Sequence, residues 1–196
     1  MAPKSRWLTF LLACLISTIS LAQNKYEREY RIKKTQFPVE GINLIEGKLK
    51  GAKRIRFYKE TDSAKISFEA KFKKDKLHYS IEFDKNGQLE DIEILISEID
   101  IPEVVIKKMH DYLGAVFKKY RIRKIQQQYP FNTDENPEVT LKNAFQNLLL
   151  PTINYELIVA GKNERQFVQY EMLFDSEGKF LLKRQSLPAN YDHILY

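Results

Sequence analysis

The chain has 196 residues and a formal charge of +6, with 32 lysines and arginines against 26 aspartates and glutamates. A chain of this length can bury roughly 70% of its unfolded surface, so its core needs neither a metal nor a disulfide. The basic excess is mild, which argues against a nucleic-acid-binding protein and leaves only weak contact with an anionic envelope surface to be expected.

The first 22 residues are typical of a secretory signal peptide. Lys4 and Arg6 precede an apolar stretch that ends near Ile19, and small residues close the segment at Ala22. The stretch is shorter than the roughly 20 residues that span a bilayer, so the sequence predicts a periplasmic or secreted protein without a transmembrane anchor. Cys14, the single cysteine, lies in this stretch, where apolar filler is favoured over lipidation.

Two helices are predicted at apolar-Pro pairs, because proline suits the first turn of a helix. Phe37-Pro38 opens the first, which extends to Leu49, and Ile101-Pro102 opens the second, which extends to Val116. Apolar residues recur at helical spacing in both segments. A third helix is predicted from Pro137 to about Leu149, capped by Asn136, with a buried stripe formed by Leu141, Ala144, Phe145 and Leu148.

Between the first two helices, from Lys53 to about Ser97, apolar and polar residues alternate with the period of a β-strand. One face of the resulting sheet should meet a core and the other should meet water. The turns are short, and Asn86-Gly87 tolerates positive φ, so neighbouring strands are expected to be antiparallel. Asp84 and Asp175 are each expected to initiate a turn and not to begin a calcium loop.

An internal repeat sets the predicted architecture. Residues 79–89 align with residues 170–180, with matching tyrosine, phenylalanine, aspartate and glycine. The predicted fold class is α+β, with two tandem helix-plus-antiparallel-sheet repeats and the helices packed on one face of a curved sheet. The units are residues 27–97 and 101–187, with an insertion at about 126–152 in the second and a C-terminal tail at 188–196.

These patterns resemble the beta-lactamase-inhibitor-like, PepSY-like domain family of Gram-negative envelope proteins. The matching elements are the Tyr-x-apolar-x-Phe-Asp-x-x-Gly pattern at residues 79–87 and 170–178, the two apolar-Pro helix openings, and the strand at residues 120–125. The resemblance implies an α+β fold whose exposed sheet face and loops bind a protein. The tryptophan that family members often carry near that strand is absent, and Trp7 is the only tryptophan in the chain.

Residues that could support catalysis or bind a metal have simpler structural interpretations. His78, His110 and His193 are not within metal-ligand spacing of one another. Ser176 and Lys179 match the Ser-x-x-Lys pattern of penicillin-recognising enzymes, but they lie in a predicted turn and the two companion motifs are missing. The acidic segment at residues 133–138 is interpreted as a helix cap in preference to a cation site. The sequence therefore predicts no enzyme, no cofactor and no metal.

The polar face of the sheet is the predicted binding surface. Mixed charge with tyrosine and arginine suits protein recognition, although any antiparallel sheet with one wet side has a similar face. Its candidate partner-binding residues are Arg54, Arg56, Tyr58, Glu69, Lys71, His78 and Glu82, with Glu93 on a neighbouring strand. A second basic cluster, interpreted as a solvated strand edge, is formed by Tyr120, Arg121, Arg123 and Lys124.

The sequence thus favours an exported, non-enzymatic module that binds a protein or peptide partner through this polar face. The alternative is a small-ligand-binding or structural envelope protein with a pocket between helices and sheet. A hydrolase is disfavoured, because no nucleophile and base lie at a workable spacing.

Overall fold

The computed structural model describes residues 24–25, 27–62, 65–162 and 166–186. The predicted signal peptide, with Cys14 and Trp7, and the predicted tail, with His193, lie outside these residues. Within the described part of the chain, no helix is both long enough and apolar enough to span a bilayer.

Ten strands form one continuous sheet. Their order across the sheet is β1-β10-β9-β8-β7-β6-β5-β4-β3-β2, so most strands pair with their sequence neighbours. All pairs are antiparallel except β1 with β10, which is parallel. The strands are β1 (Asn24–Lys25), β2 (Glu27–Ile32), β3 (Lys53–Asp62), β4 (Lys65–Lys74), β5 (Leu77–Asp84), β6 (Leu89–Ile96), β7 (Tyr120–Pro130), β8 (Asn154–Lys162), β9 (Phe167–Asp175) and β10 (Phe180–Ser186).

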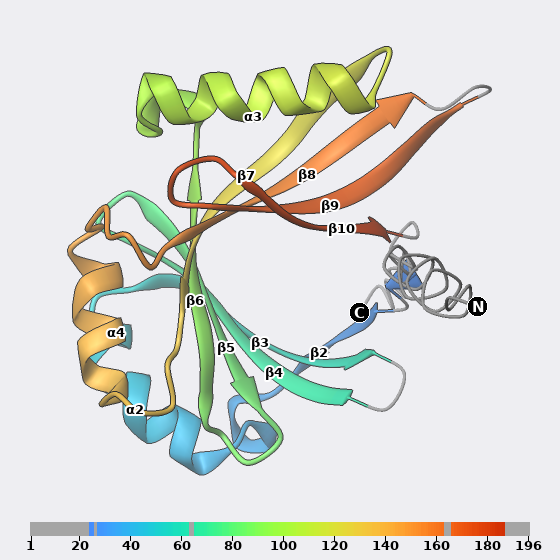
Figure 1. Ribbon diagram of the computed structural model, residues 1–196. Helices are drawn as coiled ribbons and strands as arrows, with labels where there is room; N and C mark the ends of the chain where they lie inside the picture. The colour runs from blue at the N-terminus through green and yellow to red at the C-terminus, as the bar shows by residue number, and fades with distance from the viewer. Residues whose placement is uncertain (1–23, 26, 63–64, 163–165, 187–196) are drawn as a thin grey trace, which may run out of the picture.

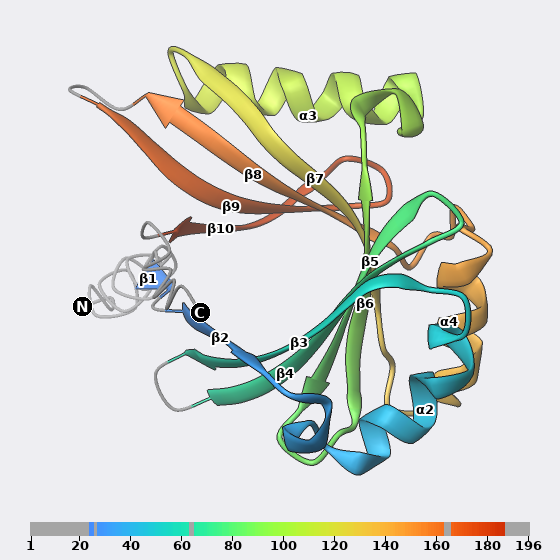
Figure 2. The same cartoon turned by 180° about the vertical axis from the view of Figure 1, so that it is seen from behind.

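The sheet is strongly curved, and three α-helices lie on its convex side (Figures 1 and 2). The helices are α2 (Val39–Leu49), α3 (Glu103–Val116) and α4 (Pro137–Phe145), and two short 3-10 helices are η1 (Lys34–Gln36) and η2 (Glu98–Asp100). Helices α2 and α4 lie side by side over the half of the sheet that contains β3 to β6, whereas α3 lies over β7 to β9. The opposite, concave side carries no helix among the described residues.

The predicted fold class is wrong. The chain does not form two tandem helix-plus-sheet repeats but one mostly antiparallel sheet with three helices. The physical reason is the pairing of β6 with β7, which continues the hydrogen-bond ladder from Asp91↔Pro130 to Ile96↔Ile125. With no free edge between the halves, the strands share one ladder and cannot act as separate units.

The inserted residues also break the equivalence of the halves. Tyr79 is buried and stacks on Phe145 of α4, with ring centroids 4.6 Å apart. Tyr170, its counterpart in the alignment, is only half-buried and packs at a tilt on Phe117, 5.3 Å away. Helix α4 therefore completes the core beneath β5, β6 and β7, where the second half has no counterpart.

The predicted elements themselves are mostly confirmed. Helices α2 and α3 begin directly after Pro38 and Pro102, and β3 to β6 fill the alternating segment. Asn136 caps α4 by accepting a hydrogen bond from the Glu138 N–H at 2.9 Å. That helix ends at Phe145, four residues before the predicted end, because Asn147 adopts a left-handed φ of 50°. Consequently Leu148, predicted to be buried, is exposed.

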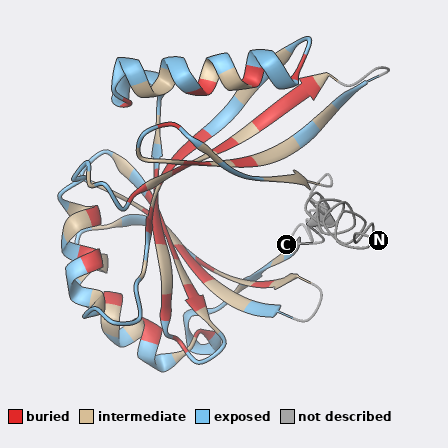
Figure 3. Cartoon of the chain, in the orientation of Figure 1, coloured by how far each residue is buried: buried red, intermediate tan, exposed pale blue. Residues whose placement is uncertain are grey.

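The core lies between the helices and the convex face of the sheet, where buried residues follow every second position of the strands (Figure 3). Phe37, just before α2, is surrounded edge-on by the rings of Phe57, Phe68 and Phe83 at 5.1 to 5.7 Å. Under α3, Tyr112 stacks on Phe180 at 4.5 Å. Edge-on and offset ring pairs add stability beyond the apolar area that they bury.

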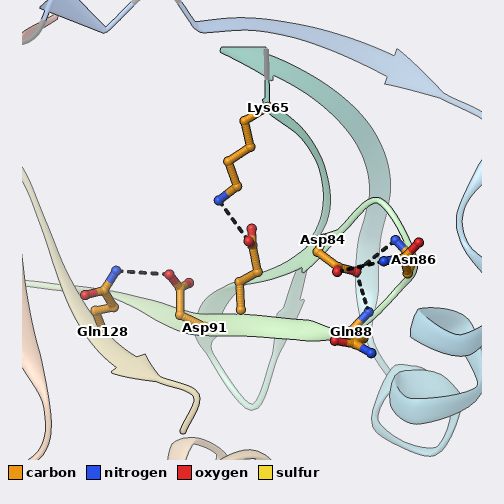
Figure 4. Close-up of polar contacts among 7 residues, drawn as sticks. Lys65, Asp84, Asn86, Gln88, Asp91 and Gln128 are labelled. Atoms are coloured by element: carbon orange, nitrogen blue, oxygen red, sulfur yellow. Dashed lines mark hydrogen bonds and ion pairs between the residues drawn. The ribbon is translucent and has the colours of Figure 1, made fainter. Parts of the chain in front are cut away.

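The turn between β5 and β6 confirms its prediction. Asp84 accepts hydrogen bonds on its side chain from the N–H groups of Asn86 and Gln88, at 2.8 and 2.9 Å (Figure 4). Asp175 makes the same contacts in the turn between β9 and β10. Gly87 has a φ of 83° and lies against the start of α2, where an added Cβ would be 2.8 Å from the backbone nitrogen of Gly41.

We expect Gly87→Ala to lower the free energy of unfolding by at least about 2 kcal/mol, because the new methyl group adds both a steric clash and an unfavourable φ. Gly47→Ala is the matched control. Gly47 lies within α2 and an added Cβ there meets nothing within 4 Å, so alanine should stabilise the helix by about 0.5–1 kcal/mol. Urea denaturation would measure both, and equal stabilities for the two variants would contradict the packing of this turn on α2.

Candidate functional site

The concave face of the sheet is polar because strand alternation directs the core residues to the helices. Arg56, Lys71, Ser80 and Glu93 are cross-strand neighbours in one row over β3, β4, β5 and β6. Directly opposite residues of an antiparallel pair share a face. Tyr58, Glu69, Glu82 and Asp91 form the next row in the same way. The face is therefore built from strands of a rigid sheet and not from loops.

Lys71 is the electrostatic centre of this face. Its Nζ lies 2.6 Å from Oε2 of Glu69 and 2.5 Å from Oε1 of Glu29, which comes from the edge strand β2. The Ser80 hydroxyl donates to the other oxygen of Glu69. Burial opposes charge on Lys71, but the two carboxylates outweigh it and raise its pKa. Lys71 thus remains protonated and links β4 to β2, while the Ser80 hydroxyl links Glu69 to β5.

The carboxylates around Lys71 respond differently to it. Burial alone would raise the pKa of Glu69, whose side chain is only 4% exposed, but Lys71 lowers it below its usual value. For Glu29 burial prevails over Lys71, and the pKa is raised. One lysine therefore keeps Glu69 ionised, while Glu29 gives up its charge more readily.

A second group of carboxylates, Glu82, Asp91 and Glu93, lies beside the first. Gln128 donates to Oδ2 of Asp91 at 3.0 Å (Figure 4), and Gln126 donates to Glu93. The other oxygen of Asp91 is buried and has no hydrogen-bond donor among the described residues. Burial raises the pKa of Asp91 to about 7, with a contribution from Glu90, which itself pairs with Lys65. Burial and the charge of Glu156 raise the pKa of Glu93 well above its usual value.

Both carboxylate groups have the composition of a site for a hard cation. In each, one oxygen per residue lies within 4.8 Å of the others, and the two groups are Glu29, Glu60 and Glu69, and Glu82, Asp91 and Glu93. Divalent cations such as Ca²⁺ prefer such oxygen ligands. In the first group Lys71 already supplies a positive charge, and in the second the raised pKa values show that protons can relieve the same repulsion.

A basic pocket lies at the end of the concave face that is remote from the β5–β6 turn. It has a volume of about 290 Å³. Basic side chains dominate its lining, and a tyrosine ring and a half-exposed leucine add apolar surface. Its lining side chains on the concave face are Arg54, Arg56, Tyr58, Lys71, Lys73, His78, Ser80, Leu95, Lys124 and Gln126.

Two irregularities in the sheet border this pocket, which we call the basic pocket from here on. Between Lys53 and Arg56 the register of β3 against β4 shifts by one residue, and Arg54 adopts a φ of 55°. Between Ile122 and Lys124 the register of β7 against β8 shifts as well. Bulges of this kind redirect side chains, and a left-handed φ is strained for a residue other than glycine.

The structure brings together most of the residues predicted for the binding surface, and their role in binding stays a prediction. Arg54, Arg56, Tyr58, Lys71 and His78 line the basic pocket. Two others do not line it: Glu69 is buried in its ion pair with Lys71, and Glu82 belongs to the second carboxylate group.

The pocket also contains residues that the sequence analysis did not assign to this surface. The sequence pattern groups Lys124 with Tyr120, Arg121 and Arg123, and it predicts no binding role for Lys73, Leu95 or Gln126. Strand alternation alone could have identified Lys73, two residues after Lys71. It could likewise have identified Leu95, two residues after Glu93 on β6. The pairing of β6 with β7, which brings in Lys124 and Gln126, has no local signal in the sequence.

The other candidate residues have structural partners. His110 contacts the Tyr120 hydroxyl through Nδ1 at 2.8 Å and Glu98 through Nε2 at 3.3 Å. The Ser176 hydroxyl donates to the carbonyl of Pro151 at 2.9 Å. These contacts connect the middle of α3 to β7 and η2, and they anchor the turn between β9 and β10.

Comparison with known proteins supports a fold and not an activity. No protein-family model matches the chain, and no curated protein matches its sequence. A solved structure from Bacteroides eggerthii, described as that of a periplasmic protein, is similar with a TM-score of 0.52 and 15% identity, covering 79% of this chain and 92% of its own. A DUF2874 family protein from Bacteroides uniformis gives a TM-score of 0.51 and 11% identity, covering 76% and 89%.

A BLIP-like protein from Bacteroides fragilis is also similar, with a TM-score of 0.49 and 12% identity over 80% of this chain and 92% of its own. At such identities the likeness concerns the fold alone. The fold is therefore shared with the Bacteroides eggerthii and Bacteroides uniformis proteins, and the resemblance to the beta-lactamase-inhibitor-like, PepSY-like family stays a prediction.

The raised pKa of Asp91 predicts a pH dependence of stability. The ordinary value is 3.8 and the folded value is about 7, so the neutral carboxyl stabilises the folded state below about pH 4, and this contribution is lost as the pH rises through 7. Asp91→Asn should remove part of the loss and raise the free energy of unfolding at pH 8 by about 2–4 kcal/mol. Urea denaturation of both proteins between pH 4 and 8, with a metal chelator in the buffer, would measure the free energy of unfolding.

Asp111→Asn, at an exposed position of α3, is the control for this experiment and should leave the pH profile unchanged. An Asp91→Asn profile that runs parallel to the wild-type profile would show that Asp91 is ionised at neutral pH.

Proposed function

We propose that the protein is an exported, non-enzymatic binding module of the bacterial cell envelope that holds a protein or peptide partner on the concave face of its sheet. The observation that carries this proposal is the basic pocket, where arginine and tyrosine side chains from a rigid sheet converge beside two bulges. Binding sites built on strands hold their side chains more precisely than sites built on loops.

Export is supported by two independent observations. The first 22 residues have the basic, apolar and small-residue parts of a secretory signal peptide. A solved structure with a similar fold, from Bacteroides eggerthii, is that of a protein described as periplasmic. A periplasmic location is consistent with both, and it would expose the concave face to envelope proteins.

Recognition of a protein is supported by two kinds of side chain on the concave face. Some have polar partners within the protein, and others are exposed and can contact a bound partner. Glu69, Glu93 and Asp91 are committed to internal contacts with Lys71, Gln126 and Gln128. Arg54 and Arg56, by contrast, are exposed, and Tyr58 is half-buried under the Lys71 ammonium group, 4.9 Å from its ring centroid. Arginine and tyrosine carry much of the binding energy in protein interfaces.

A non-enzymatic role agrees with the contacts of the residues that most resemble catalytic groups. The Ser176 hydroxyl is bonded to a backbone carbonyl, and His110 is held between Tyr120 and Glu98 on the convex side. Neither arrangement presents an activated nucleophile.

A second candidate function is the binding of a small ligand between helix and sheet. An open depression of about 650 Å³ lies between α2 and β3, lined in part by Asn43, Leu49, Ile55 and Phe57. Its volume is in the range of ligand sites. A thermal-shift screen should then find a compound class that raises the melting temperature, with the effect abolished by Asn43→Trp and retained by Arg56→Glu.

The principal test is capture of a partner from an envelope extract by the purified protein. The double variant Arg54→Glu, Tyr58→Ala should lose a partner that wild type enriches, since it reverses one charge and removes one aromatic contact. Arg28→Glu, an exposed reversal on the edge strand β2, is the matched control and should retain the partner. A partner retained equally by all three proteins would exclude the concave face as the binding surface.

A further inference from the structure

We propose that the basic pocket receives a glutamate or aspartate side chain from an acidic segment of the partner. The inference rests on the proposed function, because it names the part of the partner that enters the pocket. Five lysine or arginine side chains line a volume of about 290 Å³, which is smaller than the usual site of a drug-sized ligand and suits a single side chain with its carboxylate.

The charge of the pocket requires an anion. Of its lysines, Lys71 is neutralised by Glu69 and Glu29, which do not line the pocket. The other basic residues that line it are Arg54, Arg56, Lys73 and Lys124. The charge of Lys124 also acts on Glu93, where it opposes the rise in pKa, whereas Arg54 and Arg56 are exposed at the pocket. Clustered cationic groups attract an anionic ligand and repel a basic one.

The shape of the donors favours a carboxylate. Arg54 and Arg56 each present a planar fork of N–H groups, which pairs with the two oxygens of a carboxylate through parallel hydrogen bonds. Phosphate could use the same forks, but phosphate sites commonly add backbone N–H groups from a helix start or a glycine-rich loop. Here neither a helix start nor a glycine-rich loop lines the pocket, and away from the two bulges the strand backbones are paired in the ladders of β3, β4, β5 and β6.

Apolar contacts in the pocket distinguish a side chain from a free inorganic anion. Leu95 is 42% exposed on the concave face, directly across from Gln126, and Tyr58 also lines the pocket. Methylene groups of a glutamate can pack on these surfaces, while phosphate has none to offer. An acidic peptide segment therefore matches both the charge and the lining.

The backbone at Arg54 is independent evidence that the pocket is built and not incidental. A left-handed φ of 55° is unfavourable for arginine, and an additional residue in β3 opposite Phe72 accompanies it. Strained residues persist where the surrounding structure holds them, and they cluster at functional sites. The bulge keeps the Arg54 guanidinium available to the pocket although it disturbs the ladder.

Fluorescence anisotropy with two labelled peptides tests the inference on the purified protein. One peptide carries four consecutive glutamates, and the other carries glutamines at the same positions. Wild type should bind the glutamate peptide at least about tenfold more tightly, and the difference should shrink as salt is raised. Arg56→Gln should lower the affinity for the glutamate peptide about tenfold or more.

Arg54→Gly separates binding from folding. Glycine accepts the left-handed φ, so the melting temperature of this variant should equal or exceed that of the wild type. Its affinity for the glutamate peptide should fall several-fold. Arg121→Gln removes the same charge from an exposed position outside the pocket and should change the affinity less than twofold. Equal affinities for both peptides, or equal effects of Arg56→Gln and Arg121→Gln, would overturn the inference, as would displacement of the peptide by low-millimolar inorganic phosphate.

Competition separates this inference from the proposed function. Suppose that excess glutamate peptide does not displace a captured partner, but that the Arg54→Glu, Tyr58→Ala variant no longer binds this partner. That result would overturn the inference that the pocket binds a carboxylate, and it would leave the proposed binding function intact. Pocket-dependent binding of the glutamate peptide without any captured partner would support the pocket and count against the wider role.

Discussion

The ladder between β6 and β7 is the constraint on which the rest of the structure depends. It runs from Asp91↔Pro130 to Ile96↔Ile125 and merges all strands into one curved sheet. A single sheet has one convex and one concave side, and the helices cover the convex side. The concave side is then left to polar residues, whose charges must be satisfied by one another, by protons or by a bound partner.

The concave face therefore contains both side chains that stabilise the fold and side chains that can contact a bound partner. At one end of the concave face, Lys71 and two glutamines hold carboxylates whose burial would otherwise cost several kcal/mol. At the other end, exposed arginines line a small pocket. Lys71 belongs to both regions, so the buried ion pairs also fix the position of one wall of the pocket.

The sequence predicted what short-range patterns encode. Alternation located β3 to β6, Pro38 and Pro102 located the helix starts, and Asp84 and Asp175 located two turns. It did not predict which strands pair across long separations, because the join of β6 to β7 depends on residues 29 to 39 positions apart. Because long-range pairing is not encoded locally, the sequence did not place Lys124 beside Arg54 and Arg56, which the shared sheet brings together. For the same reason, two local repeats were interpreted as two folding units.

One consequence of the topology concerns how the concave side can respond to a bound molecule. Strands β1 and β2 are separated by residue 26 alone, yet they lie on opposite edges of the sheet. Two consecutive peptide units span at most about 7.3 Å, so the chain itself ties the two edges together. The arch cannot open like a hinge without losing β1 from β10 or β2 from β3. A ligand must therefore fit the concave face in its existing shape, and binding should cost the protein little conformational entropy.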